Sequence, residues 1–249
     1  MAKHKEIRLR MHDLVFIVVA IFMLGAILGM SFLPKPQEKF TNMDIPESSV
    51  DVGIPAVDAE GRGVVGRLYT TVKPGTGKIL FNVDNILSQL DTQFSSRTAV
   101  KAAADYMNID PSSIDVIFNL KVNATIVEGP SAGSAMASSV VLALKGISPD
   151  NVMMTGTIEE DGKIGDVGAI EEKARAAKEN GATLFIVPAG QASDTTSRSE
   201  RKCDSFDSIR VCTIKYVRES RNISLSLNIT VVEAGTLEDI VKIFEEKEE

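Results

Sequence analysis

The hydrophobic residues of this 249-residue chain fall into two regimes, one continuous and one periodic. Residues 14–33 form the continuous run, twenty positions without a charged side chain. At about 1.5 Å of rise per residue the run makes a helix of roughly 30 Å, which is long enough to cross a bilayer. A basic tail, residues 1–13, precedes it, and a polar, proline-containing linker, residues 34–49, follows it. The pattern predicts an uncleaved signal anchor in contact with the lipid bilayer. A cleaved signal peptide is the alternative, and the length of the run favours the anchor.

The charges on either side of this run predict its orientation. The short tail carries four lysines and arginines, whereas Lys35 and Lys39 follow the run. Because positive charge favours the cytoplasmic side, we expect a single-pass protein of the cell membrane with a cytoplasmic N-terminus. The domain that follows would then be extracytoplasmic.

From residue 50 onward the hydrophobic positions are periodic. Alternation and short apolar runs predict strands at 49–59, 63–75, 78–83, 114–122, 151–158, 182–190, 209–217 and 224–234. A spacing of three to four residues predicts helices at 85–108, 130–145 and 169–180. A final helix is expected after Thr236, which forms a Thr-x-x-Asp capping box with Asp239. Helices that alternate with strands predict an α/β fold, with mixed sheets and packed helices over residues 50–249.

Residues 190–207 contain one large apolar residue, Phe206, and are expected to form a mobile surface loop. Cys203 and Cys212 are the only cysteines of the chain. Their separation suits a disulfide across a local hairpin, and two unpaired thiols are the alternative.

Charge and histidine content exclude several functions. The chain has 27 Lys and Arg against 34 Asp and Glu, a net charge of −7, so a nucleic-acid partner is not expected. Both histidines, His4 and His12, precede the apolar run. Imidazole-based catalysis and histidine-ligated metal sites are therefore excluded from the folded part, and we expect no metal and no cofactor.

A nucleotide site is also not expected. The stretch from Val72 to Leu80 contains a Gly-Lys pair, but a P-loop needs glycine where Val72 stands and serine or threonine where Ile79 stands. The protein should therefore work without ATP.

Ser131 is the first candidate catalytic residue. It follows Gly129 and Pro130 at the start of the predicted 130–145 helix. Unpaired backbone N–H groups point outward at such a position, which suits a nucleophile whose attack creates an oxyanion. A serine that merely caps a core helix is the alternative.

Lys173 is the second candidate. On a helical wheel it lies on the alanine-rich side of the 169–180 helix, between Ala169 and Ala177, and it is the only charged residue there. A lysine so placed can extend its amine into solvent. If the amine is instead buried, its pKa falls and it becomes a usable general base.

Thr155 is the third candidate, and it precedes Gly156 at the end of a predicted strand. Its hydroxyl could hold the lysine amine in place, as the third group of a catalytic triad orients the base. A threonine that simply suits a strand is the alternative.

The order of these motifs resembles the proteolytic domain of the Lon protease family, whose members are Ser–Lys dyad peptidases. The matching motifs are Gly129-Pro130-Ser131-Ala132-Gly133, the Met-Thr-Gly that ends at Gly156, and the helix that carries Lys173. The resemblance implies a Lon-type fold over about 50–188, with Ser131 as nucleophile, Lys173 as general base and Thr155, Gly129, Pro130 and Gly156 in support.

Two departures accompany the resemblance. The family usually has glycine where Ala169 stands, and residues 190–224 look like an insertion that holds both cysteines. Lon itself carries an ATPase module, and here we expect the predicted membrane anchor in its place. The family also implies a homo-oligomeric ring, such as a hexamer.

The sequence thus predicts a membrane-anchored, ATP-independent serine endopeptidase that cleaves unfolded or loosely folded polypeptides. The alternative is a non-catalytic, membrane-tethered scaffold or binding module that keeps the Lon-like fold.

Overall fold

The computed structural model describes residues 11–30, 45–83, 90–122, 129–206 and 209–248. The chain divides into two compact units, residues 1–39 and residues 40–249.

The helix of the N-terminal unit, α1 (Met11–Met30), forms over most of the predicted apolar run. Several of its apolar side chains, among them Phe16 and Phe22, are exposed. Taken over the described residues, no helix combines the length and the apolar character needed to cross a membrane. The structure therefore does not confirm the predicted anchor, which stays a prediction, and residues 34–44 of the linker lie outside the described part.

The C-terminal unit is built on a mixed sheet. Over the described residues the sheet has seven strands in the order β11-β8-β5-β1-β2-β4-β3. The strands are β1 Ser48–Val57, β2 Gly63–Pro74, β3 Ile79–Val83, β4 Ile114–Lys121, β5 Val152–Met154, β8 Leu184–Pro188 and β11 Thr230–Ala234. β1, β2 and β4 are antiparallel neighbours, β3 pairs with β4 in parallel, and β5, β8 and β11 extend the sheet from β1 in parallel. A mixed sheet with packed helices confirms the predicted fold class.

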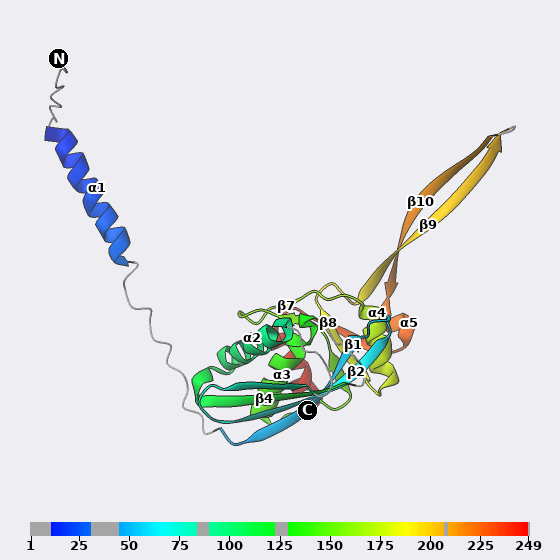
Figure 1. Ribbon diagram of the computed structural model, residues 1–249, viewed down its shortest axis with the longest axis horizontal. Helices are drawn as coiled ribbons and strands as arrows, with labels where there is room; N and C mark the ends of the chain where they lie inside the picture. Colours follow the sequence, from blue (N-terminus) through cyan, green and yellow to red (C-terminus); the bar gives the residue numbers. More distant parts are fainter. Residues whose placement is uncertain (1–10, 31–44, 84–89, 123–128, 207–208, 249) are drawn as a thin grey trace, which may run out of the picture. The chain divides into compact units, whose positions relative to one another are not determined.

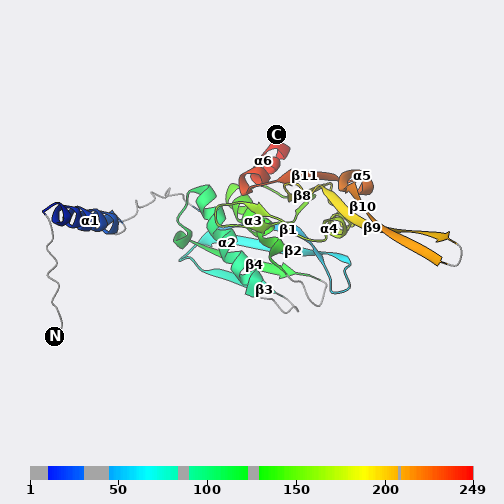
Figure 2. The same cartoon turned by 90° about the horizontal axis from the view of Figure 1, so that it is seen from above.

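Helices cover the sheet from two sides (Figures 1 and 2). α2 (Leu90–Met107), α3 (Gly133–Lys145) and α6 (Leu237–Glu248) share one hydrophobic core, and α4 (Ile170–Glu179) and α5 (Ile223–Leu227) share another. Successive residues of a strand point to opposite faces. Accordingly, Met154 joins the α3 core, whereas Met153 joins the α4 core. The residue after Met154 is Thr155, and the alternation aims its side chain toward α4.

The predicted loop at 190–207 is wrong, because most of it is a strand. β9 (Ser193–Phe206) and β10 (Ile209–Asn222) pair antiparallel over their whole length and run out from the domain as a two-stranded ribbon (Figure 1). Described side chains on both faces of this ribbon are exposed, so neither face needs to be apolar. The alternation of polar and apolar residues that marks a half-buried strand is therefore absent from β9.

The predicted strand at 224–234 is correct only in its second half. Its first half forms α5, because the Asn222 side chain accepts a hydrogen bond from the Leu225 N–H at 3.0 Å and caps a helical turn. Asn228 then ends the turn in the left-handed conformation, with φ of 50°. The predicted capping box is confirmed, since Thr236 and Asp239 each accept a hydrogen bond from the other's backbone N–H.

Candidate active site

Ser131 lies in a tight turn rather than in the first turn of an α-helix. Pro130–Ala132 form a 3₁₀ turn, and α3 begins only at Gly133. Gly129 precedes the turn with φ of 97° and ψ of 162°, a conformation that favours glycine. Ser131 is half-buried at this position.

The turn is fastened to the end of β5. The Gly156 N–H donates to the carbonyl oxygen of Ser131 at 2.9 Å, and the Ser134 N–H donates to the carbonyl oxygen of Gly156 at 2.9 Å. A side chain on Gly156 would collide with Ile164, and one on Gly133 would collide with Ile158. Gly133 therefore lets the start of α3 approach the segment after β5 closely, and Gly156 lets that segment pack against Ile164.

Lys173 is buried on the inner side of α4 and does not reach into solvent. It is 5% exposed, and burial lowers the pKa of its amine to about 8. Within the described part of the chain no carboxylate forms an ion pair with it. A buried amine without a counter-charge is destabilised in its protonated form, so neutral amine is available near physiological pH.

Thr155 links the lysine to the serine turn. The Lys173 amine donates a hydrogen bond to the Thr155 hydroxyl oxygen at 3.3 Å. The Thr155 hydroxyl in turn donates to the carbonyl oxygen of Ser131 at 3.4 Å. Among the hydrogen bonds of the described residues, none joins the Ser131 hydroxyl directly to the Lys173 amine. The structure thus brings the three predicted residues together, with Thr155 as the connection.

The segment before α4 holds a feature that the sequence analysis missed. The Gln191 side chain accepts from the Val167 N–H at 3.1 Å and donates to the Val167 carbonyl oxygen at 2.9 Å. These two bonds fix the backbone a few residues before Lys173. A lone glutamine carries no sequence signal for such a role, since its partner lies 24 positions away.

Ala169, the residue before α4, has φ of 57° and ψ of 44° and forms no side-chain cap. The left-handed conformation costs a residue with a Cβ about 1–2 kcal/mol, whereas glycine adopts it freely. We expect Ala169→Gly to stabilise the domain by up to about 1 kcal/mol, after the greater flexibility of glycine in the unfolded chain is subtracted. Urea unfolding of the two proteins measures this difference, and Ala177→Gly, in the interior of the same helix, should destabilise instead. Destabilisation by Ala169→Gly would contradict the prediction.

The other predicted residues lie elsewhere. Cys203 and Cys212 are directly opposite one another in the β9–β10 ribbon, and a disulfide joins them. Over the residues that the structure describes, no group of three His, Cys, Asp or Glu side chains is arranged to hold a metal ion.

Comparison with known proteins identifies the family. The profile of the Lon protease (S16) C-terminal proteolytic domain matches residues 69–221, which is more than half of the chain and includes Ser131, Thr155 and Lys173. The chain therefore belongs to this family of proteolytic domains.

Individual relatives agree with the family match. The Lon protease of Xanthomonas oryzae pv. oryzae is 25% identical over 179 residues, which are 70% of this chain and 20% of that protein. Lon protease 2 of Bacillus subtilis is 35% identical over 108 residues, 43% of this chain and 17% of that protein. The Lon protease of Neorickettsia sennetsu is 30% identical over 129 residues, 51% of this chain and 15% of that protein. The chain thus spans a fifth or less of the length of these relatives.

Proposed function

We propose that the protein is an ATP-independent serine endopeptidase that uses a Ser131–Lys173 dyad on unfolded or loosely folded polypeptides. The observation that carries the proposal is the buried Lys173 amine, which has Thr155 as its hydrogen-bond partner and no ion pair in the described part of the chain. Side chains that are buried only for stability are normally apolar, because burying a charged group costs free energy. An amine kept in this position is suited to accept a proton.

The chemistry proceeds in two steps. Neutral Lys173 takes the proton of the Ser131 hydroxyl as its oxygen bonds to the carbonyl carbon of the substrate, and the protonated amine then gives that proton to the leaving nitrogen as the C–N bond breaks. Water attacks the resulting ester with the same lysine as base.

The N–H groups of Gly133 and Ser134 are engaged in hydrogen bonds to backbone carbonyls. We therefore assign the N–H groups of Ser131 and Ala132, at the start of the turn, to the oxyanion.

The 3.3 Å contact between Lys173 and Thr155 supports a positioning role for Thr155. Attack requires the Ser131 side chain to turn toward the lysine, and the hydroxyl of Thr155 holds the amine within reach of the turn. Catalytic hydrogen bonds often tighten only when substrate binds.

The experiment combines labelling with cleavage. The full chain, without nucleotide, should cleave unfolded casein, and a fluorophosphonate probe should label it on the peptide that contains Ser131. A labelled serine elsewhere would contradict the proposed nucleophile. If neither cleavage nor labelling occurs in an assembled sample, the non-catalytic scaffold is the better description.

We further propose that residues 14–33 anchor the protein in a membrane, with the C-terminal unit outside the cytoplasm. The uncharged run and the apolar side chains exposed along α1 support this placement. The full chain expressed in bacteria should stay with the membrane fraction after alkaline carbonate washing. Protease added to spheroplasts should degrade the domain. Release by carbonate, or protection until the cells are lysed, would contradict the anchor or its orientation.

A further inference from the structure

The β9–β10 ribbon has two faces of different chemistry. Residues directly opposite one another in an antiparallel pair share a face. The register of the ribbon pairs Cys203 with Cys212, Arg201 with Ile214, and Ser199 with Tyr216. These residues and Arg210 therefore share one face, which we call the arginine face. The other face consists, over the described side chains, of Glu200, Lys202, Asp204, Thr213 and Lys215.

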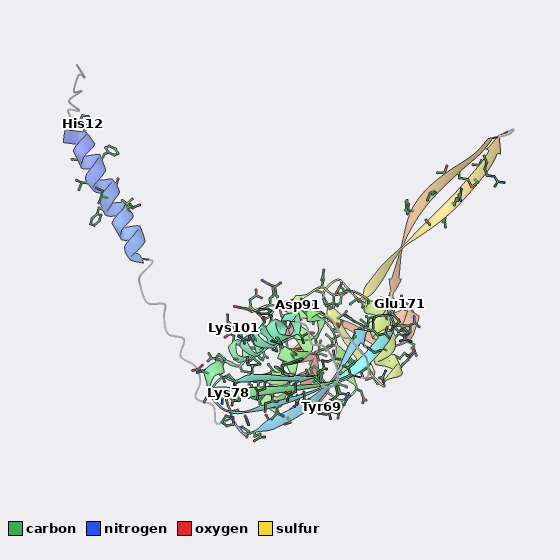
Figure 3. All side chains as sticks on the ribbon, in the orientation of Figure 1. His12, Tyr69, Lys78, Asp91, Lys101 and Glu171 are labelled. Carbon is green, nitrogen blue, oxygen red and sulfur yellow. A yellow bond between two sulfur atoms is a disulfide. The ribbon has the colours of Figure 1, made fainter. Side chains whose placement is uncertain are left out.

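The arginine face is open to solvent along its described length. Ile214 is 55% exposed and Tyr216 is 72% exposed, and Arg201 and Arg210 are exposed beside them. Figure 3 shows the side chains of the ribbon standing away from the rest of the domain. Among the described residues this face has two arginines and no carboxylate, whereas the other face has equal numbers of each charge. Exposed arginine, tyrosine and aliphatic residues in one patch are the composition of a protein–protein contact.

The charge of the ribbon is opposite to that of the domain that carries it. Residues 193–222 contain seven Lys and Arg against five Asp and Glu. The remainder of the C-terminal unit, residues 40–192 and 223–249, contains 14 against 26. A second copy of this chain therefore offers an acidic surface that complements the arginine face.

We propose that the arginine face of the ribbon binds the acidic hollow of a second copy. The hollow, of about 330 Å³, lies between α2, the start of α6 and the turn that holds Glu160–Gly162. Its lining combines carboxylates with an apolar floor and an aromatic ring: Ala102, Asp105, Tyr106, Glu160, Asp161, Gly162, Thr236, Leu237 and Glu238. The apolar floor receives Tyr216 and Ile214, and the carboxylates face the arginines.

Three of these carboxylates already have lysine partners within the chain. Glu160 pairs with Lys101, Asp161 with Lys163 and Glu238 with Lys242. These pairs are exposed, and exposed ion pairs contribute little to stability. An arginine can therefore join or replace the lysine at small cost.

The contact joins two different surfaces, so it is head-to-tail. Contacts of this kind generate closed rings when the rotation between copies closes, and open chains when it does not. The inference does not depend on the proposed Ser131–Lys173 chemistry.

The test uses charge reversal and its repair in the full-length chain, with self-association measured by sedimentation velocity. The ribbon variant is Arg201→Glu/Arg210→Glu and the hollow variant is Glu160→Arg/Glu238→Arg. Each alone should associate roughly 100-fold more weakly than the wild type, because like charges then meet at every contact. An equal mixture of the two should regain the wild-type assembly, because each ribbon then meets a hollow of opposite charge.

The matched control is Lys202→Glu/Lys215→Glu, which makes the same charge change on the opposite face of the ribbon. It should associate as the wild type does. Circular dichroism melting of each variant reports whether the fold is kept. A monomeric wild type, equal weakening by the control, or a mixture that stays dissociated would each overturn the proposal.

Discussion

Replacing Ser131 with alanine, or Lys173 with methionine, is expected to lower the rate of casein cleavage by about 10³-fold or more. Alanine removes the attacking oxygen, and methionine keeps the length of the side chain but removes the base. No imidazole can substitute for the amine, because both histidines of the chain, His4 and His12, lie outside the C-terminal unit. Initial rates at saturating casein measure the loss. A double variant should be no slower than either single variant, since the two groups act as a unit.

Two further variants make this result specific. Arg175→Met removes an exposed cation of the same helix, which pairs only with Glu171 one turn away among the described ion pairs, and it should leave the rate unchanged. Thr155→Val keeps the shape but loses the hydroxyl that contacts Lys173, and it should retain intermediate activity.

Because catalysis needs the neutral amine, the wild-type rate should rise as the pH increases through about 8. Unchanged cleavage rates in Ser131→Ala and Lys173→Met would contradict the proposal that these two residues form the catalytic dyad.

Lys173 could be predicted because it lies on a strongly periodic helix, whereas Ser131 lies in a turn and Thr155 follows a three-residue strand. The alanine-rich side of α4 places Lys173 against the sheet, and the alternation of β5 aims the residue after Met154 at the same helix. The helix and the end of the strand therefore meet at one contact, the hydrogen bond from Lys173 to Thr155. The spacing of the Gly-Pro-Ser turn added the nucleophile through its resemblance to the Lon proteolytic domain.

The predicted strand at 209–217 forms part of β10. The other strand of the ribbon, β9, could not be predicted, because it buries neither face and so carries no hydrophobic alternation. Cross-strand pairing along 14 positions holds the ribbon, and the disulfide joins the fourth pair from the Phe206–Ile209 end. The two bonds between Gln191 and Val167 could not be predicted because they join positions 24 residues apart, which no local pattern records. For the left-handed Ala169, the only signal was the glycine that the family usually has at that position.

Lys173→Met is also expected to make the domain more stable, by about 2 kcal/mol at pH 7. The pKa of the amine is about 8 in the folded protein, against its ordinary value of 10.5, so folding at pH 7 buries a charge at a cost in free energy. That cost is about 3 kcal/mol at 1.36 kcal/mol per pKa unit. Loss of the hydrogen bond to Thr155 offsets about 1 kcal/mol of the gain.

The pH dependence of this difference has a fixed sign. Between about pH 8 and 10.5 the unfolded chain still binds the proton that the folded protein has released, so the stability of the wild type rises with pH relative to that of the variant. Urea unfolding of both proteins from pH 6.5 to 9.5 gives the difference, and subtraction of the two curves removes the titration of all other groups. The advantage of Lys173→Met should be full below pH 8 and should shrink steadily above it. A difference that stays constant over this range would mean that the amine keeps its ordinary pKa. Lys173 would then be unsuited to act as the base, whatever the activity of the variants.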